Sequence, residues 1–182
     1  MREDPGRGGL DALGLRIAIL GPSNSGKSTL ACAISRVTGL PVVHLDQLYH
    51  LPQTDWVPRP SDEFTALHET AIADAHWVME GNYTRLLSPR LDRATGVILL
   101  DVPTSVSLYR YVRRCWFERE RRGGLEGGLD SVKWDMIRHI TTVTRSNRIR
   151  YRQMFEGIRQ PKLVLNSARA LARFYHANTL SR

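Results

Sequence analysis

The sequence predicts an α/β protein in which a parallel β-sheet is covered by helices. Five short apolar runs alternate along the chain with stretches of helical character, which is the pattern of a parallel sheet with crossover helices. Between the first run and the first helix, residues 21–28 fit the phosphate-binding pattern G-x-x-x-x-G-K-[ST]. At 182 residues, the chain is long enough for one domain with a full hydrophobic core.

The segment 21–28 contains the residue types that a phosphate-binding loop needs. Its two glycines let the backbone turn so that successive N–H groups point at one anion, and Lys27 adds a charge for the β- and γ-phosphates. The Ser28 hydroxyl is placed to hold Mg²⁺. The loop fits ATP and GTP alike, and ATP with Mg²⁺ is what we expect. The expected nucleotide contacts in the loop are Gly21, Ser23, Asn24, Ser25, Gly26, Lys27, Ser28 and Thr29.

The loop has the flanking elements that its function requires. The apolar run 15–20 before it predicts a buried strand. Residues 28–34 after it predict a helix, whose N-terminus would face the phosphates. A triphosphate site is therefore better supported than a glycine turn before an ordinary helix.

The remaining elements follow from local patterns. A second strand is expected over 41–45, closing at Asp46, and three prolines make 47–60 an irregular connection. Ser61 or Asp62 is expected to cap the helix that follows. The third, fourth and fifth strands are expected over residues 76–79, 96–100 and 162–165.

The ends of the chain and its composition narrow the class of protein. Residues 1–14, with four glycines and alternating charges, are expected to form a loose tail before a domain over 15–178. No apolar run approaches the ~20 residues that cross a bilayer, so we expect a cytoplasmic protein with no membrane partner.

The cysteines and histidines do not indicate a disulfide or a metal site. Cys32 and Cys115 lack C-x-x-C spacing and predict reduced thiols. The histidines, His44 among them, have no metal-ligand spacing and are expected to be structural or on the surface.

Positive charge is concentrated in the second half of the chain. The net charge is +8, with −3 over residues 1–102, +7 over 103–160 and +4 over 161–182. Of the 26 basic residues, 23 are arginine, whose planar fork suits phosphate groups. The basic half therefore fits either a polyphosphate substrate or a nucleic acid.

Two basic segments in this half are candidates for closing over a ligand. Residues 117–130 place glycine pairs on both sides of charged residues, which predicts a hinged lid; a solvent loop is the alternative. The stretch 130–157 has a helical period with arginines on one face. We expect Arg145, Arg148 and Arg152 to contact phosphate because a lid precedes them, and we count Arg148 with the nucleotide-binding residues. A solvated basic face is the alternative.

Three carboxylates compete for the metal. Asp46, Glu80 and Asp101 each follow a predicted strand, and ligands of open parallel sheets gather at the carboxyl ends of the strands. Asp101 has the best local pattern. Because Val102 and Pro103 follow it at once, an orienting hydrogen bond to the phosphate loop is an alternative role. Pattern alone does not rank the three.

With these residues in view, the chain resembles the adenylate-kinase-like group of P-loop kinases, which includes shikimate and gluconate kinases. It looks closest to the bacterial topology modulation proteins, also described as adenylate kinase-related. The resemblance runs from about residue 15 to residue 175. It is carried by the phosphate loop and by Leu45–Tyr49, Asp55–Pro58 leading to Glu63 and Phe64, Trp77–Tyr83, Leu100–Pro103 and Arg113–Arg114.

The resemblance implies the three-layer sandwich of the P-loop NTPases, with a five-stranded parallel sheet ordered 2-3-1-4-5 and an arginine-rich lid. It also implies a substrate-binding insertion at about 47–75. Asp46 would lie beside the metal and the acceptor hydroxyl, and Glu80 would hold the metal through water. The implied catalytic residues are Lys27, Asp46, Glu80, Arg113, Arg114 and Arg121, and the implied metal ligands are Ser28, Glu80 and Asp46.

The implied activity is phosphoryl transfer from ATP to a nucleotide or another small molecule. In place of the Asp-Gly-Phe-Pro of nucleoside monophosphate kinases, this chain has Glu80-Gly81-Asn82-Tyr83, which weakens the case for AMP as the acceptor. The alternative function is nucleotide-gated binding of DNA or RNA by the basic half, although the chain has no helix-turn-helix, zinc-finger or RNA-binding signature. The sequence indicates neither the acceptor nor the oligomeric state.

Overall fold

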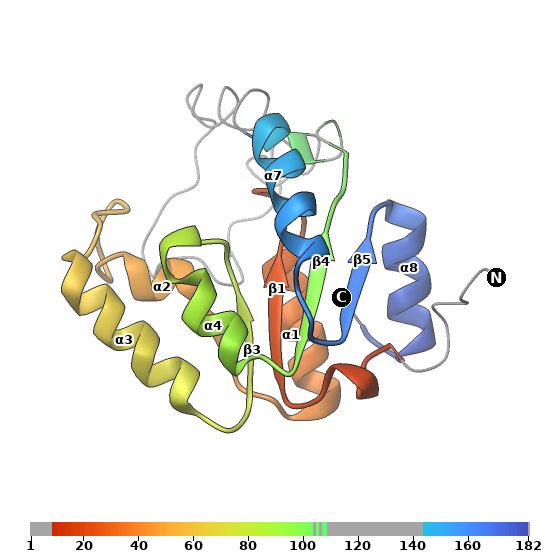
Figure 1. Cartoon of the computed structure of the whole chain (residues 1–182), viewed down its shortest axis with the longest axis horizontal. Coiled ribbons are helices and arrows are strands. Elements are labelled where there is room, and N and C mark those ends of the chain that lie inside the picture. Colours follow the sequence, from red (N-terminus) through yellow and green to blue (C-terminus); the bar gives the residue numbers. More distant parts are fainter. Residues whose placement is uncertain (1–8, 104, 106, 109–143, 182) are drawn as a thin grey trace.

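A parallel sheet of five strands forms the centre of the molecule (Figure 1). The computed structural model describes residues 9–103, 105, 107–108 and 144–181, with no side chains for 144–149. The strand order is β2-β3-β1-β4-β5, and every neighbouring pair is parallel. The strands are β1 (Arg16–Leu20), β2 (Val42–His44), β3 (Trp77–Glu80), β4 (Gly96–Leu100) and β5 (Lys162–Leu165).

The three central strands are apolar along nearly their whole length because both of their faces are buried. All residues of β3 and β4 are buried, as are Ile17, Ala18, Ile19 and Leu20 of β1. Continuous apolar runs are what strands covered by helices on both sides require. The edge strands β2 and β5 are only partly buried.

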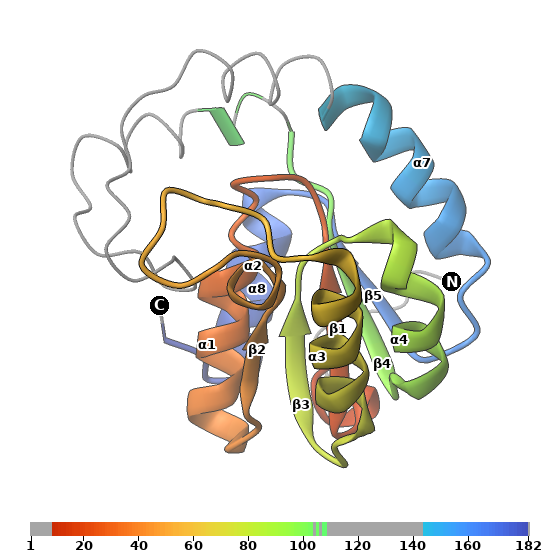
Figure 2. The same ribbon diagram turned by 90° about the vertical axis from the view of Figure 1, so that its left-hand side faces the viewer.

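Helices cover both faces of the sheet (Figure 2). Alternate residues of β1 point to opposite faces: Ile17 and Ile19 belong to one core cluster, and Ala18 and Leu20 to the other. The first cluster includes α1 (Lys27–Thr38), α8 (Ala168–Ala177) and the short helix η1 (Asp11–Leu13). The second includes α2 (Leu45–Tyr49), α3 (Ser61–Ala73), α4 (Leu87–Arg93) and α7 (Thr144–Glu156). A further short helix, η2 (Thr84–Leu86), precedes α4. This arrangement confirms the predicted three-layer sandwich and the predicted strand order 2-3-1-4-5.

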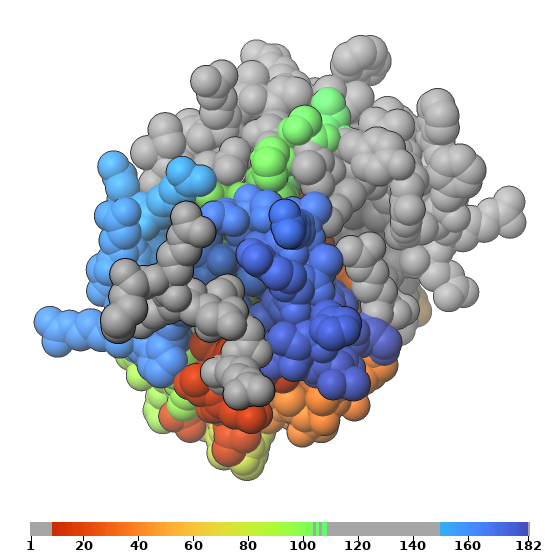
Figure 3. All heavy atoms as spheres, turned by 90° about the vertical axis from the view of Figure 1, so that its right-hand side faces the viewer, coloured from red at the N-terminus to blue at the C-terminus, as the bar shows by residue number. Residues whose placement is uncertain are grey.

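The expectation of a loose tail over residues 1–14 is wrong for residues 9–14. Leu10 and Leu13 are buried in the same cluster as Phe174 of α8, and Figure 3 shows this N-terminal segment (red) against the C-terminal helix (blue). The Thr95 hydroxyl donates a hydrogen bond to the carbonyl oxygen of Leu13 (2.7 Å). Leu10 and Leu13 are spaced by one helical turn, and the burial of their apolar side chains orders this segment despite the neighbouring glycines.

Two local expectations around α2 and α3 are also wrong. Residues 45–49 form a short helix, so Asp46 lies in the first turn of α2 and does not close a strand. The residue that precedes the first turn of α3 is Pro60, rather than Ser61 or Asp62. The carbonyl oxygen of Pro60 accepts the Phe64 N–H (3.0 Å), and no described side chain caps the start of this helix.

The C-terminal part of the predicted helix over 130–157 is present as α7. Tyr151, Phe155 and Ile158 are buried in the second core cluster. The predicted lid, 117–130, and the side chains of Arg145 and Arg148 lie outside the described residues. Within the described ranges, no helix has the length and hydropathy to span a membrane.

We expect His68 of α3 to make stability depend on pH. Among the described residues, neither ring nitrogen of this buried side chain has a hydrogen-bond partner, and burial together with the charge of Arg90 lowers the pKa of His68 to about 4. The unfolded chain binds the proton near pH 6.5, so protonation favours unfolding as the pH falls from about 6.5 towards 4. The wild type should lose about 2–3 kcal/mol of unfolding free energy between pH 7 and pH 4.5 through this group.

Denaturant unfolding of His68→Phe at the two pH values measures this contribution, because phenylalanine retains an aromatic side chain that cannot be protonated. The matched control is His176→Phe, which changes an exposed histidine of α8. The control should keep the wild-type pH dependence. An equally steep dependence in His68→Phe would contradict the assignment.

Candidate functional site

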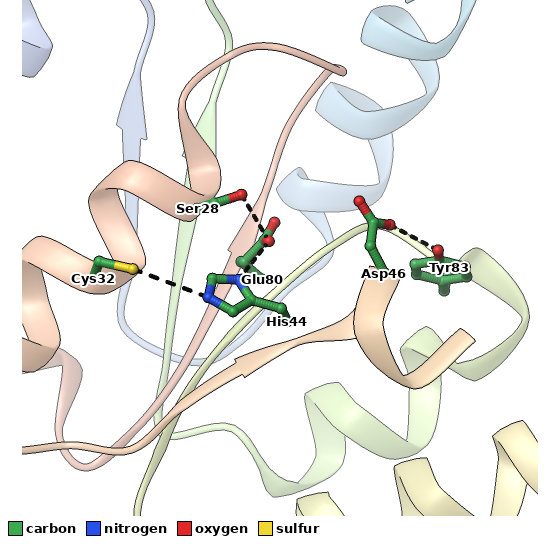
Figure 4. A network of polar contacts seen from close by, with 6 residues as sticks. All are labelled: Ser28, Cys32, His44, Asp46, Glu80 and Tyr83. Carbon is green, nitrogen blue, oxygen red and sulfur yellow. Dashed lines mark hydrogen bonds and ion pairs between the residues drawn. The ribbon is translucent and has the colours of Figure 1, made fainter. Parts of the chain in front are cut away.

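The polar residues that follow β1, β2 and β3 meet at one edge of the sheet. The three strands are parallel neighbours, so their carboxyl ends lie together. The loop 21–26 follows β1, α2 follows β2, and the segment 80–83 begins at the end of β3. Figure 4 shows two groups of side chains here: one contains Ser28, Cys32, His44 and Glu80, and the other is the pair of Asp46 and Tyr83.

The phosphate loop connects β1 directly to α1, as predicted. All of the predicted loop residues lie between the end of β1 and the first turn of α1. Gly21 has a φ of 145°, and a Cβ at this position would overlap the carbonyl oxygen of Leu100 at the end of β4. Only glycine therefore fits where the loop leaves the sheet. The Lys27 ammonium donates a hydrogen bond to the Pro22 carbonyl oxygen (3.0 Å), which places its charge over the loop.

Glu80 at the end of β3 is the carboxylate that contacts the loop helix. The Ser28 hydroxyl donates to Glu80 Oε1 (2.8 Å), and His44 Nδ1 lies 2.9 Å from the same oxygen (Figure 4). Because a carboxylate only accepts, Nδ1 is the donor of this bond. The Sγ atom of Cys32 lies 4.0 Å from the other ring nitrogen, Nε2.

The surroundings of Glu80 keep its carboxylate ionised. The Glu80 side chain is buried (3% exposed), and burial taken by itself would raise its pKa. The hydrogen bond from His44 and the charge of Lys27 outweigh burial, and the pKa lies below its ordinary value. An ionised carboxylate beside a hydroxyl is a pair of oxygen ligands of the kind that Mg²⁺ prefers. The residues present therefore fit a Mg²⁺ ion.

His44 is a site residue that sequence analysis missed, since it was expected to be structural or on the surface. Its direct partner in the sheet is Glu80, because β2 and β3 pair in that register. The signal that was available is its position at the carboxyl end of a predicted strand. Metal-ligand spacing does not reveal this role, because the role depends on which strand lies beside β2.

Asp46 lies apart from the Glu80 cluster and has a different partner (Figure 4). The Tyr83 hydroxyl donates to Asp46 Oδ1 (2.7 Å). Burial and the negative charge of Asp46 raise the pKa of Tyr83, so the phenol stays protonated and remains a donor. The Tyr83 ring also contacts the rings of Tyr49 (5.0 Å between centroids) and Phe64 (5.1 Å), which fixes its orientation.

The third carboxylate, Asp101, is engaged by an arginine of α7. Arg152 Nε donates to Asp101 Oδ2 (2.6 Å), and its guanidinium also forms an ion pair with this oxygen. Of the three arginines expected to contact phosphate, Arg152 is the one whose side chain is described, and its described partner is a carboxylate. Arg113, Arg114 and Arg121 lie outside the described residues.

No protein-family model matches the chain, and no curated protein matches it either. Solved structures with a similar fold include a gluconokinase from Sinorhizobium meliloti 1021 (15% identity, covering 92% of this chain and 93% of that one, TM-score 0.48). A shikimate kinase from Aquifex aeolicus is 18% identical (83% and 86% covered, TM-score 0.47). A deoxyadenosine kinase from M. mycoides with bound dCTP is 19% identical (82% and 89% covered, TM-score 0.44). At these levels, the similarities establish neither a substrate nor an activity for this chain.

The close approach of Gly21 to β4 predicts unequal effects of two alanine substitutions. Gly21→Ala should lower the unfolding free energy by about 2–4 kcal/mol. The new Cβ would clash with the backbone of Leu100, and alanine would also be strained at this positive φ. Gly39→Ala is the matched control: Gly39 also has a positive φ (75°), but no described atom lies within 4 Å of the place that a Cβ would take there. It should cost only about 1 kcal/mol. Denaturant unfolding measures both, and equal losses would contradict the predicted clash.

Proposed function

We propose that this protein is an ATP-dependent phosphotransferase of the small P-loop kinase type. The observation that carries the proposal is the contact between the Ser28 hydroxyl, in the first turn of α1, and the ionised Glu80 carboxylate at the end of β3. It joins a loop of phosphate-binding sequence to a carboxylate suited to the metal that accompanies a nucleoside triphosphate.

The nucleotide would bind along the loop 21–28. Its backbone N–H groups and the N-terminus of α1 would face the phosphates, and Lys27 would contribute the positive charge for the β- and γ-phosphates. Ser28 and Glu80 would hold Mg²⁺, which supplies charge neutralisation of the phosphate oxygens when bound. We also assign Arg148 to the nucleotide, and Arg113, Arg114 and Arg121 to the transferring phosphoryl group.

Asp46 is the residue we assign to the acceptor. Tyr83 holds one oxygen of its carboxylate in place (2.7 Å) in the first turn of α2, the helix that follows β2. In the proposed step, the acceptor hydroxyl gives its proton to Asp46 and its oxygen attacks the γ-phosphorus of ATP. The bond from that phosphorus to the β–γ bridging oxygen breaks, which releases ADP and the phosphorylated acceptor.

We further propose that the chain belongs with the adenylate-kinase-like topology modulation proteins, on the motifs that carry the resemblance. The acceptor would be a nucleotide or another small molecule, and the protein would act in the cytoplasm. Nothing in the described part of the chain favours nucleic-acid binding over phosphoryl transfer.

The experiment that tests this function is a coupled assay of ADP release. Nucleotides, nucleosides, sugars and small acids are supplied in turn as acceptors with Mg-ATP, and water alone serves as the control. A kinase should release ADP far faster with its acceptor than with water. Failure to bind any nucleoside triphosphate in a direct titration would overturn the proposal.

Lys27→Ala should lower acceptor-dependent ADP release by about 10²- to 10³-fold or more, because it removes the loop's own countercharge for the transferring phosphate. The control is Arg173→Ala, which removes an exposed cation from α8 and should leave the rate unchanged. ADP release by Lys27→Ala at the wild-type rate would show that the loop does not bind the reacting phosphates.

Glu80→Gln should raise the Mg²⁺ concentration needed for half-maximal activity by about 10- to 100-fold. Glutamine keeps the size of the side chain and removes the charge that attracts the ion. The control, Glu63→Gln, makes the same change on α3, where the side chain is largely exposed. A magnesium titration of ADP release measures both variants, and an unchanged requirement in Glu80→Gln would rule out this carboxylate as a metal ligand.

A further inference from the structure

We propose that Asn82 is a positioning residue that orders the phosphate loop before the nucleotide binds, by holding both polar backbone groups of Gly21. The inference rests on the proposed function, because pre-ordering matters only if the loop binds phosphate. Neither the loop sequence nor the Glu80 cluster assigns this task to Asn82.

The contact consists of two hydrogen bonds between the same two residues. The Gly21 N–H donates to Asn82 Oδ1 (3.1 Å), and Asn82 Nδ2 donates to the Gly21 carbonyl oxygen (2.9 Å). A carboxamide carries a donor and an acceptor side by side, so it can satisfy both groups at once. An alanine at this position would offer neither, and an aspartate would offer only the acceptor.

Gly21 is the loop residue at which such a restraint has the largest effect. It is the first residue after β1, and its glycine backbone loses more conformational freedom on ordering than that of any other residue type. A loop that orders only on binding weakens affinity by the cost of that ordering. Because Asn82 fixes the Gly21 backbone in the ligand-free protein, we expect this cost to be met during folding.

Asn82 is itself anchored from the helix layer behind it. Arg90 of α4 is fully buried, and its Nη2 donates to the Asn82 carbonyl oxygen (2.7 Å). Burial lowers the pKa of Arg90 to about 10, so the guanidinium remains charged at neutral pH. Its Nε and Nη1 have no hydrogen-bond partner within the part of the chain that the structure describes. The hydrogen bond that this buried guanidinium does make therefore holds the backbone of Asn82.

Asn82 therefore contacts both the start of the phosphate loop, through its side chain, and α4, through its carbonyl oxygen. Its neighbours in the segment have other partners, since Glu80 contacts Ser28 and Tyr83 contacts Asp46.

The test is the affinity for a non-hydrolysable ATP analogue with Mg²⁺, measured by titration calorimetry at a temperature where all variants are folded. Asn82→Ala should bind about 10- to 100-fold more weakly than the wild type, as expected for the loss of two hydrogen bonds. Asn82→Asp should also bind at least 10-fold more weakly, because its carboxylate faces the Gly21 carbonyl oxygen. The control is Asn178→Ala, which removes a side-chain hydrogen bond to Phe174 (2.8 Å) in α8 and should leave the affinity unchanged.

Hydrogen exchange of the Gly21 amide separates positioning from a general loss of stability. In the ligand-free wild type, this amide should exchange slowly, and in Asn82→Ala, which removes its acceptor, faster by at least 10-fold, whereas amides of β4 should be unaffected. Rapid exchange in the ligand-free wild type would overturn the inference, and this measurement needs no variant to fold.

The outcomes distinguish this inference from the proposed function. If the wild type does not bind the analogue, the proposed function fails. If the wild type binds it and both Asn82 variants bind it equally tightly, the positioning role fails while the function stands.

Discussion

The hydrogen bond from Ser28 to Glu80 is the interaction on which the site depends. It joins residues 52 positions apart in the sequence, and it can form only because β3 lies directly beside β1. That neighbour relation comes from the crossover that sends β2 to the edge of the sheet and returns the chain to the centre. The position of the carboxylate is therefore a property of the topology, and no local stretch of sequence specifies it.

The segment from Glu80 to Tyr83 organises the rest of the site. Three of its side chains contact three separate parts: Glu80 contacts α1, Asn82 the start of the phosphate loop, and Tyr83 the first turn of α2. A small shift of this segment would move all three contacts at once. The aromatic contacts of Tyr83 and the bond from Arg90 oppose such a shift.

The features of this fold that can be predicted from the sequence are those with a local signal. Continuous apolar runs predicted the central strands because both of their faces are buried, and the loop was found because its glycines and lysine are contiguous. The roles of His44 and Asn82 depend on which strand is adjacent to which, and a hydrogen-bond partner 36 or 61 residues away leaves no local pattern. The start of α3 was misplaced by one or two residues because a backbone carbonyl, rather than a side chain, satisfies its first turn.

Because residues 9–14 pack against the core, the folded domain includes them and does not begin at residue 15. Gly96 at the start of β4 lies so close to this segment that a Cβ there would come within 2.5 Å of Leu13. A chain trimmed to begin at residue 15, the expected start of the domain, would uncover Phe174 and leave the Thr95 hydroxyl without its acceptor at Leu13. A shortened version of this protein should therefore retain Leu10 and Leu13.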